Sequence, residues 1–282
     1  TPEEITIEPR RPEFDFSGVR KYWLKDPFTS QFMNALSIVV PQSERTVIDI
    51  VRKYADNISD PKLIRDMDAL IRQEGRHTLM HLRCNDLLEK CGYPAIRPFE
   101  RFHKFFIRML RRISPPEWEL AMPAAFEHFT SAISRDFIVN NAFWTDDQSN
   151  AAIDFTNWHA LEELEHKSVA YDVYELIGNS RTERAAAALA SMVVLLPMLG
   201  ITWSWMLVKD GQLGKISDNV KGLNILFGRN GFVSQIISRL PEFIQPDFHP
   251  DQHDTKGLEK LWREKLFAEG GQLHELYSNP AA

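Results

Sequence analysis

The chain has 282 residues, of which 44% are hydrophobic and 26% are charged, and its net charge is −6. This composition excludes disordered and collagen-like proteins, and the acidic balance argues against a nucleic-acid partner, which usually requires a basic face. The two cysteines, Cys84 and Cys91, are too few for a disulfide framework or a four-cysteine zinc site. So low a cysteine count is typical of a reducing compartment, and the charged, proline-rich N-terminal segment does not resemble a secretory signal. We therefore expect a cytoplasmic protein.

Residues 1–24 are predicted to form an extended arm, because Pro2, Pro9 and Pro12 interrupt any helix there. Beyond the arm, apolar residues recur at helical spacing, and the period-two alternation that is typical of strands is almost absent. The predicted helices cover residues 26–39, 42–57, 62–90, 99–112, 116–142, 149–177 and 255–268.

Proline and glycine set the predicted helix boundaries. Pro41 separates the first two helices, and Ser43 is the expected N-cap of the second. Gly92 ends the third helix. We therefore expect an all-α fold, with a helical bundle over residues 25–180 and additional helices packed on it over residues 181–282.

One long segment carries no charge at all. Residues 185–208 are apolar and lie between Arg184 and Lys209. About 20 apolar residues suffice to cross a bilayer. Three interpretations therefore stay open: a buried helix of the core or of a homo-oligomer interface, a helix in contact with a membrane, and a true span. Residues 215–245 then alternate apolar and charged side chains as an amphipathic helix pair does, which fits either a membrane interface or packing on the same domain. Any membrane-surface contact is thus expected within residues 185–245.

The strongest chemical signal is a Glu-x-x-His motif that occurs twice in long predicted helices. Glu74 and His77 form the first copy, and Glu163 and His166 form the second. Side chains three residues apart lie on one helix face, one turn from each other. Each pair can therefore hold one metal ion.

A lone glutamate precedes each motif on an earlier predicted helix. Glu44 lies 30 residues before Glu74. Glu127 lies 36 residues before Glu163. This order matches the di-iron carboxylate arrangement of four-helix bundles, in which two helices each give a glutamate and two each give Glu-x-x-His. Glu44 and Glu127 have apolar neighbours, among which an unpaired carboxylate is costly, and metal coordination would offset that cost.

The residue types fit a site for two metal ions. Two divalent ions close together require several carboxylates to neutralise their charge. We expect Glu74 and Glu163 to bridge both ions, Glu44 and Glu127 to be terminal ligands, and each motif histidine to complete one ion. Oxygen and imidazole donors suit two Fe ions, with Mn or a mixed Mn/Fe pair as alternatives.

A further histidine distinguishes the second motif. His159 lies four residues before Glu163, so His159, Glu163 and His166 fall on one helix face. This set resembles that of the ferritin-like di-iron N-oxygenases that oxidise aryl amines, whose second iron has an extra histidine at this spacing. The resemblance implies seven metal ligands: Glu44, Glu74, His77, Glu127, His159, Glu163 and His166.

A wider resemblance covers most of the chain. The segments FMNALSIVVPQSER (32–45), EGRHTLMH (74–81), WHALEELEHKSVAYDVY (158–174) and PDFHPDQHDT (246–255) are similar to the family named "predicted metal-dependent hydrolase". All seven ligand positions are present in this chain. The resemblance therefore implies a fold and a metal site, whereas it says less about the reaction, because the same ligands suit hydrolysis and oxygen chemistry. The expected fold is all-α, with a ferritin-like four-helix bundle core and additional C-terminal helices.

Other polar residues near the motifs have two interpretations each. His81 is expected either to orient a metal ligand or to be an ordinary core or surface histidine. Glu162 is expected to be a partner of a ligand, an eighth ligand, or neither of these. Glu165 points away and is expected to be solvated. His249 and His253 form a weak metal motif, for which structural loop contacts are the alternative.

The sequence favours a di-iron oxidoreductase that activates O2 to oxidise an unidentified small substrate, either apolar or an amine, with an unidentified electron donor. Its expected catalytic residues are the metal ligands alone. A dinuclear metal-dependent hydrolase, in which metal-activated water attacks the substrate, is the alternative. A non-catalytic metal store or a membrane-associated binding protein is the third.

Overall fold

The computed structural model describes residues 7–139, 150–178 and 180–278, and most of them are helical. Among these residues there is no β-strand, so the protein is all-α, as predicted. The arm is extended where it is described, because residues 7–24 contain no helix.

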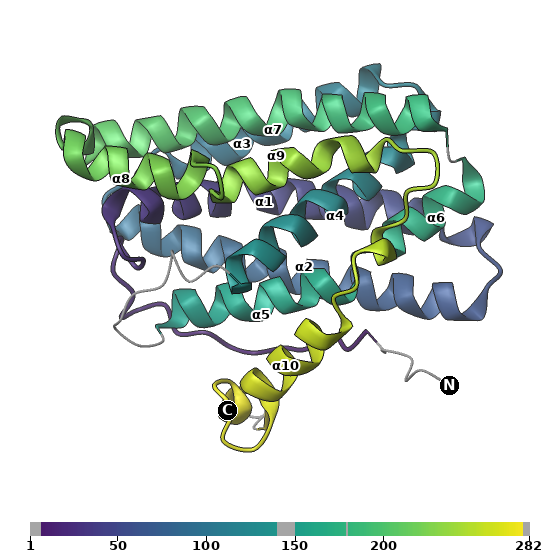
Figure 1. The fold of residues 1–282 in the computed structure, drawn as a ribbon, viewed down its shortest axis with the longest axis horizontal. Helices are drawn as coiled ribbons and strands as arrows, with labels where there is room; N and C mark the ends of the chain where they lie inside the picture. The colour runs from purple at the N-terminus through teal and green to yellow at the C-terminus, as the bar shows by residue number, and fades with distance from the viewer. Residues whose placement is uncertain (1–6, 140–149, 179, 279–282) are drawn as a thin grey trace.

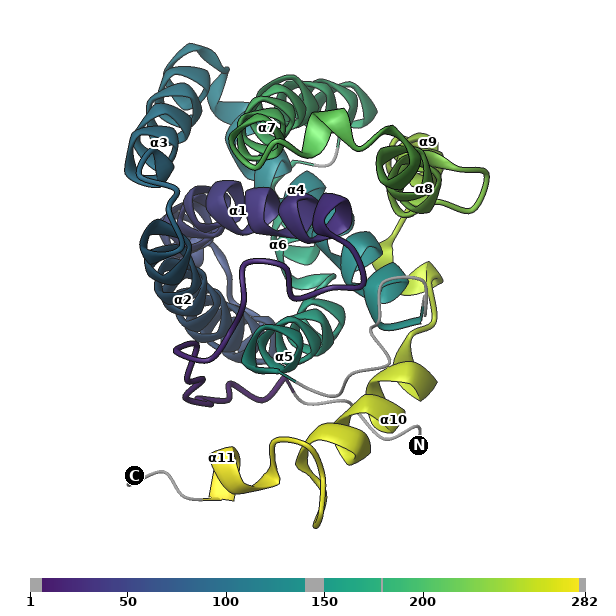
Figure 2. The ribbon, with the colours of Figure 1, turned by 90° about the vertical axis from the view of Figure 1, so that its left-hand side faces the viewer.

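Four helical segments lie side by side and form the bundle (Figures 1 and 2). The fourth consists of two helices in succession, α5 and α6, and the ferritin-like character of the bundle stays a prediction. The bounds of the bundle helices are α1 (Pro27–Lys53), α2 (Pro61–Lys90), α4 (Pro116–Val139), α5 (Ala151–Glu165) and α6 (Val169–Ile177).

The predicted break at Pro41 is wrong, because α1 continues through it. Proline lacks the amide hydrogen that would bond to the carbonyl four residues earlier. That carbonyl, of Ser37, instead accepts a hydrogen bond of 3.2 Å from the side chain of Asn85 on α2. The helix begins with Asp26 as its cap, and the predicted cap Ser43 lies buried inside it. The side chain of Asn85 thus replaces the hydrogen bond that Pro41 cannot donate, so the helix continues where the local sequence predicts a break.

In the second half of the bundle the sequence predicts one helix where the structure has two. Residues 149–177 are predicted as one helix, but α5 ends at Glu165 and α6 starts at Val169. At the break, the Lys167 ammonium turns to the C-terminal segment and donates to the carbonyl of His253 over 3.0 Å. Prediction and structure agree closely for α2, which Gly92 ends with a φ of 103°. The predicted end of the fifth helix, at 142, lies outside the described residues.

The C-terminal third adds helices around the bundle. α7 lies against α1 and α4, and α3 lies beside α7 (Figure 2). The amphipathic pair predicted within residues 215–245 is present as α8 and α9, and α10 matches the predicted final helix. The division of the chain at residues 24 and 180 stays a prediction. The bounds are α3 (Ile96–Ile113), α7 (Arg181–Lys209), α8 (Ile216–Phe227), α9 (Phe232–Phe243), α10 (Lys256–Phe267) and the short α11 (His274–Ser278).

The N-terminal arm runs along the outer side of α5 and α2 (Figure 1). Its aromatic side chains fix it there: the rings of Phe14 and Phe16 lie 5.9 and 5.8 Å from the ring of Phe155 on α5. The carbonyl of Pro12 accepts a hydrogen bond of 2.8 Å from Arg76 on α2. The arm is therefore anchored closely enough to bring Arg10 into contact with two buried glutamates of α5.

Candidate metal centre

The four predicted glutamates each come from a different helix and meet inside the bundle. Glu44 lies on α1, Glu74 on α2, Glu127 on α4 and Glu163 on α5, and all four are fully or almost fully buried. This convergence follows from helix pairing, because each helix turns the face that carries its glutamate towards the bundle axis.

His166 defines one half of the cluster. Its Nε2 atom lies 3.0 Å from Glu127 Oε2, 3.3 Å from Glu74 Oε1 and 3.5 Å from Glu163 Oε2. The ligand atoms that these four residues offer all lie within 4.8 Å of one another, which is close enough for one metal ion. Because His166 caps α5, the helix break places its ring at this point.

His77 defines the other half. Its Nδ1 atom lies 3.3 Å from Glu74 Oε1 and 3.6 Å from Glu163 Oε1. Glu44, Glu74 and His77 form a second group whose ligand atoms lie within 4.8 Å of one another. Glu74 and Glu163 therefore face both halves, as bridging ligands would.

His159 completes the set of seven at the edge of the cluster. Its Nε2 atom lies 2.9 Å from Glu163 Oε1 and 3.6 Å from Glu44 Oε1. The rings of His159 and His77 are 4.0 Å apart between centroids. All seven predicted positions thus lie together, and their role as ligands stays a prediction.

His81 fixes the orientation of His159 through a chain of hydrogen bonds. The Ser37 hydroxyl donates to Asn85 Oδ1 over 3.1 Å, which leaves it to accept from His81 Nδ1 at 2.9 Å. His81 Nε2 then lies 3.1 Å from His159 Nδ1, within hydrogen-bond distance. Burial and the neighbouring His159 hold the pKa of His81 well below its usual range, so its ring is neutral. His159 Nε2 in turn lies 2.9 Å from Glu163 Oε1, so this series of contacts directs at the carboxylates the nitrogen that would bind a metal ion.

Arg10 and Glu162 support His77 from outside the cluster. His77 Nε2 lies 3.1 Å from Glu162 Oε2, and Arg10 donates to Glu162 Oε1 from its backbone amide (3.2 Å) and its guanidinium (3.3 Å). Burial raises the pKa of Glu162 to about 8, and the charge of Arg10 acts against that shift. Glu162 therefore lies behind a predicted ligand, in the position of an orienting partner.

Gln73 and Glu165 support His166 in the same way. His166 Nδ1 donates to Gln73 Oε1 over 2.9 Å, and Gln73 Nε2 donates to Glu165 Oε2 over 3.2 Å. The prediction that Glu165 is solvated is wrong, because Arg10 and Arg263 enclose it with contacts of 2.9 and 2.6 Å. These arginines come from the arm and from α10. No local spacing in the sequence connects them to residue 165.

Five of the eight carboxylate oxygens of the four cluster glutamates lack a hydrogen-bond donor from the described residues. Glu44 Oε1, Glu74 Oε2, Glu163 Oε2 and both oxygens of Glu127 are buried and make no hydrogen bond within the described part of the chain. A buried polar atom left in this state costs free energy. A pair of metal ions would satisfy these atoms, and their oxygen and imidazole chemistry suits iron or manganese. The residues present therefore fit the predicted metals.

The protonation of the cluster also indicates missing positive charge. Burial and the neighbouring carboxylates raise the pKa values of Glu44 and Glu74 well above their usual range, and burial raises that of Glu127 to about 7. Burial alone would raise the pKa of Glu163, but the charge of His166 outweighs it and lowers this pKa. Burial alone would lower the pKa of His166, but Glu127 and Glu163 raise it. Protons thus occupy the place of cations, and metal binding must release them.

The weaker histidine motif does not converge on one point. His249 Nε2 lies 2.8 Å from Asp172 of α6, whereas His253 Nε2 lies 2.7 Å from Glu242 of α9. Each histidine therefore forms a separate contact that ties the C-terminal segment to a helix.

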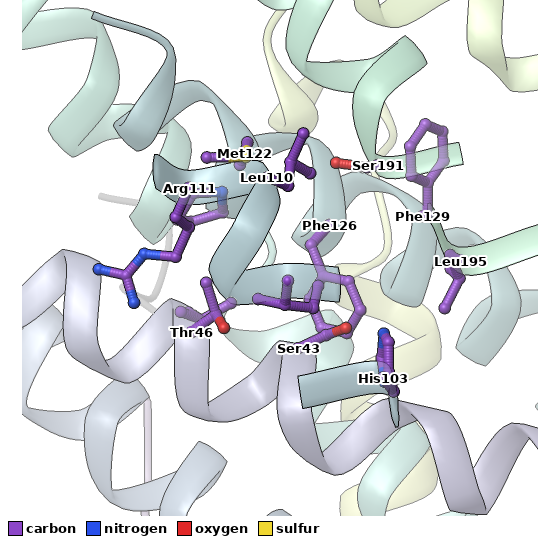
Figure 3. Close-up of a pocket in the computed structure, with 13 residues that line it drawn as sticks. Ser43, Thr46, His103, Leu110, Arg111, Met122, Phe126, Phe129, Ser191 and Leu195 are labelled. Atoms are coloured by element: carbon purple, nitrogen blue, oxygen red, sulfur yellow. The ribbon is translucent and has the colours of Figure 1, made fainter. Parts of the chain in front are cut away.

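A cavity of about 70 Å³ adjoins the cluster on the side of His159 and Glu163. Its remaining walls are mostly apolar, with Met33, Phe137 and Phe155 among them. A smaller cavity of about 40 Å³ lies between α1, α3, α4 and α7, where the buried ring of His103 and Phe126 face each other (Figure 3). The first cavity provides room for a small apolar molecule next to the predicted metals.

The fold and the site define an all-α protein with a buried cluster of carboxylates and histidines that could hold metal ions. A family model described as "Predicted metal-dependent hydrolase" matches residues 8–254, so the chain belongs to that family. This confirms the resemblance of the four sequence segments. Comparisons with curated proteins and with solved structures gave no match.

Proposed function

We propose that this protein is a metal-dependent enzyme whose cluster holds two ions, and that with iron it uses O2 to oxidise a small apolar or amine substrate. The observation that carries the proposal is the position of Glu74, whose Oε1 lies 3.3 Å from both His77 Nδ1 and His166 Nε2. Glu163 likewise directs one oxygen to each histidine. Two shared carboxylates between two imidazoles are the arrangement that a pair of ions requires.

The residues of the chain have distinct parts in this proposal. Two ferrous ions would supply electrons for the reduction of O2. The four glutamates would neutralise the ions and replace water around them. Glu162 and Gln73 would hold the rings of His77 and His166 in fixed orientations, as partners of metal-bound histidines commonly do.

His159 is the predicted ligand closest to the substrate. It lines the apolar cavity together with Glu163 and is 13% exposed, whereas the other predicted ligands are almost completely buried. A substrate in this cavity would contact the ring of His159 and the apolar walls. The walls therefore favour a substrate with little charge. His159 would contact both this substrate and a bound metal ion.

The family description favours a hydrolase as a second candidate. A dinuclear hydrolase would use the same ligands to hold ions that activate water against an ester, amide or phosphate. Both candidates are metal-dependent enzymes, and the reaction with O2 separates them. The two free cysteines are in keeping with a cytoplasmic enzyme, and this location is part of the proposal.

An anaerobic Fe(II) titration of the metal-free protein, followed by a pulse of O2, tests the proposal. We expect two irons per chain, consumption of O2 and a transient visible absorption band. His159→Ala should retain both irons and alter the band and its decay. Two bound ions without O2 consumption, together with Mn(II)- or Zn(II)-dependent cleavage of esters or phosphoesters, would establish the hydrolase instead.

A further inference from the structure

A large apolar surface covers the side of the protein that α3, α7 and α8 form. On α7, one helix face exposes Leu189 (66%), Val193 (63%) and Val208 (61%), and no charged residue occurs from 185 to 208. α7 is long and apolar enough to cross a membrane, yet only 28% of its most apolar part is buried. A helix this apolar is ordinarily buried in a soluble protein, so its exposed face requires an explanation.

The neighbouring helices extend this surface on both sides. α8 exposes Ile216 (74%), Val220 and Phe227 on one face, and the Phe227 ring lies 6.2 Å from the ring of Trp203 on α7. On the opposite edge of α7, the Trp205 ring lies 5.1 Å from the ring of Phe99 on α3.

α3 contributes a stripe of its own. Phe102, Phe105, Met109 and Ile113 are exposed along the helix at a spacing of three or four residues. Arg97 marks the other side of α3, because it pairs with Asp86 and Glu89 of α2. By helical spacing, the exposed stripe therefore lies between the side of α3 that contacts α2 and the side whose Phe99 contacts α7. We refer to the exposed apolar residues of α3, α7 and α8 together as the apolar face.

Basic side chains border the apolar face. α3 carries six arginines and lysines and one glutamate, although the whole chain has a net charge of −6. Arg101, Arg108 and Arg112 are exposed beside the stripe, and none of them forms an ion pair with a described carboxylate. An apolar helix face with arginines along its border is typical of segments that lie in the interface of an anionic membrane.

We propose that the apolar face docks the protein on the surface of an anionic lipid bilayer, with α3 and α7 lying in its interface. The opposite side of α7 is packed inside the protein: Met198, Thr202 and Met206 are buried, and Leu195 and Ser191 point into the cavity between the helices (Figure 3). α7 therefore cannot leave the bundle to span the bilayer without exposing its inner face. In a symmetric dimer through this face, the α3 arginines of both copies would border the same interface, and like charges there repel.

Flotation of the full-length metal-free protein with preformed vesicles tests this proposal. We expect binding to vesicles of phosphatidylcholine with phosphatidylglycerol, weak binding to phosphatidylcholine alone, and weaker binding at high salt. The triple variant Arg101→Glu, Arg108→Glu, Arg112→Glu should reduce the affinity for anionic vesicles by roughly tenfold or more, because each basic side chain contributes to the attraction.

A matched control separates the position of the charges from their number. Arg65 on α2 and Lys256 and Lys260 on α10 are exposed away from the apolar face. Reversal of these three to glutamate changes the net charge equally and should leave most of the vesicle binding intact. Val193→Ser with Leu189→Ser should weaken binding to anionic vesicles without any change in the charge of the protein.

Three results would overturn the proposal: equal loss of vesicle binding in the control triple variant, no binding to anionic vesicles, or a wild-type dimer that the α7 double variant dissociates. Circular dichroism and the molecular mass in solution, measured for every variant, distinguish loss of binding from loss of fold. Because the vesicle assay uses metal-free protein, its outcome is independent of the proposed oxidation chemistry.

Discussion

The metal centre and the apolar face distribute polarity in opposite ways. The centre buries four glutamates whose oxygens largely lack hydrogen-bond donors, whereas the apolar face exposes valine, leucine and phenylalanine to solvent. Each is unfavourable in an isolated chain in water. On our proposals, both regions therefore require a component from outside the chain: metal ions for the centre and lipid for the apolar face.

Among the substitutions considered, loss of a carboxylate that faces both halves of the cluster should have the largest effect, and this effect is on metal binding. Because Glu74 and Glu163 each face both halves of the cluster, Glu74→Ala or Glu163→Ala should abolish binding of both ions rather than one. Metal analysis after anaerobic loading measures the ions per chain. Glu264→Ala, which removes an exposed carboxylate on α10, is the control and should bind two. Retention of two ions in the Glu74 or Glu163 variants would show that these residues are not ligands.

Loss of Arg10 should have the next largest effect, on both the free energy of unfolding and the affinity for metal. Arg10→Ala leaves Glu162 and Glu165 buried with fewer partners, which we expect to destabilise the protein by about 3–5 kcal/mol. The supporting contact behind His77 is loosened as well, so metal affinity should fall by roughly 10- to 100-fold. Urea unfolding and competition with a chelator measure the two effects. The neighbouring Arg11 is exposed, and Arg11→Ala should match the wild type in both measurements.

The stabilisation that metal provides should depend on pH. The pKa of Glu127 is raised to about 7, so between its unfolded value and about pH 7 the metal-free folded state holds a proton that the unfolded chain releases. This contribution to the stability of the metal-free protein is lost as the pH rises through that window. His77 is neutral with or without metal, because burial lowers its pKa, so its titration cancels in the comparison. The difference in melting temperature between loaded and metal-free protein should therefore widen from about pH 5 to about pH 7. A constant difference would contradict the proton release inferred for the cluster.

Substitutions on the apolar face should have the smallest effect on folding. Val193→Ser exchanges one exposed side chain, and we expect its effect on the free energy of unfolding to stay within about 0.5 kcal/mol. Met206 is fully buried on the opposite side of the same helix, and Met206→Ser should cost about 2–5 kcal/mol. Chemical denaturation compares the two variants. A large cost at Val193 would indicate that this residue contributes to the fold.

Features of the fold and the site that depend on residues close together in the sequence are predicted well, whereas features that depend on distant residues are not. The two Glu-x-x-His pairs follow from helical spacing, since the motif places two donors on one face whatever surrounds the helix. The full set of seven residues is what the family resemblance implies. The continuity of α1 through Pro41 cannot be predicted in this way, because the donor that replaces the missing amide belongs to Asn85 on another helix. The orienting partners Arg10 and Arg263 are equally inaccessible, since they reach Glu165 from elements far apart in the sequence.

Glu165 also links the site to the order in which the chain is synthesised. The seven predicted ligands lie between residues 44 and 166, so they leave the ribosome well before Arg263 does. Among the described residues, Glu165 pairs with Arg10 and Arg263, and through Gln73 it supports His166, so part of this support comes from a residue made after all the predicted ligands. The polar support of the site is therefore completed from a helix that is synthesised long after the last predicted ligand, so truncation of the chain before α10 should weaken the site without removing any predicted ligand.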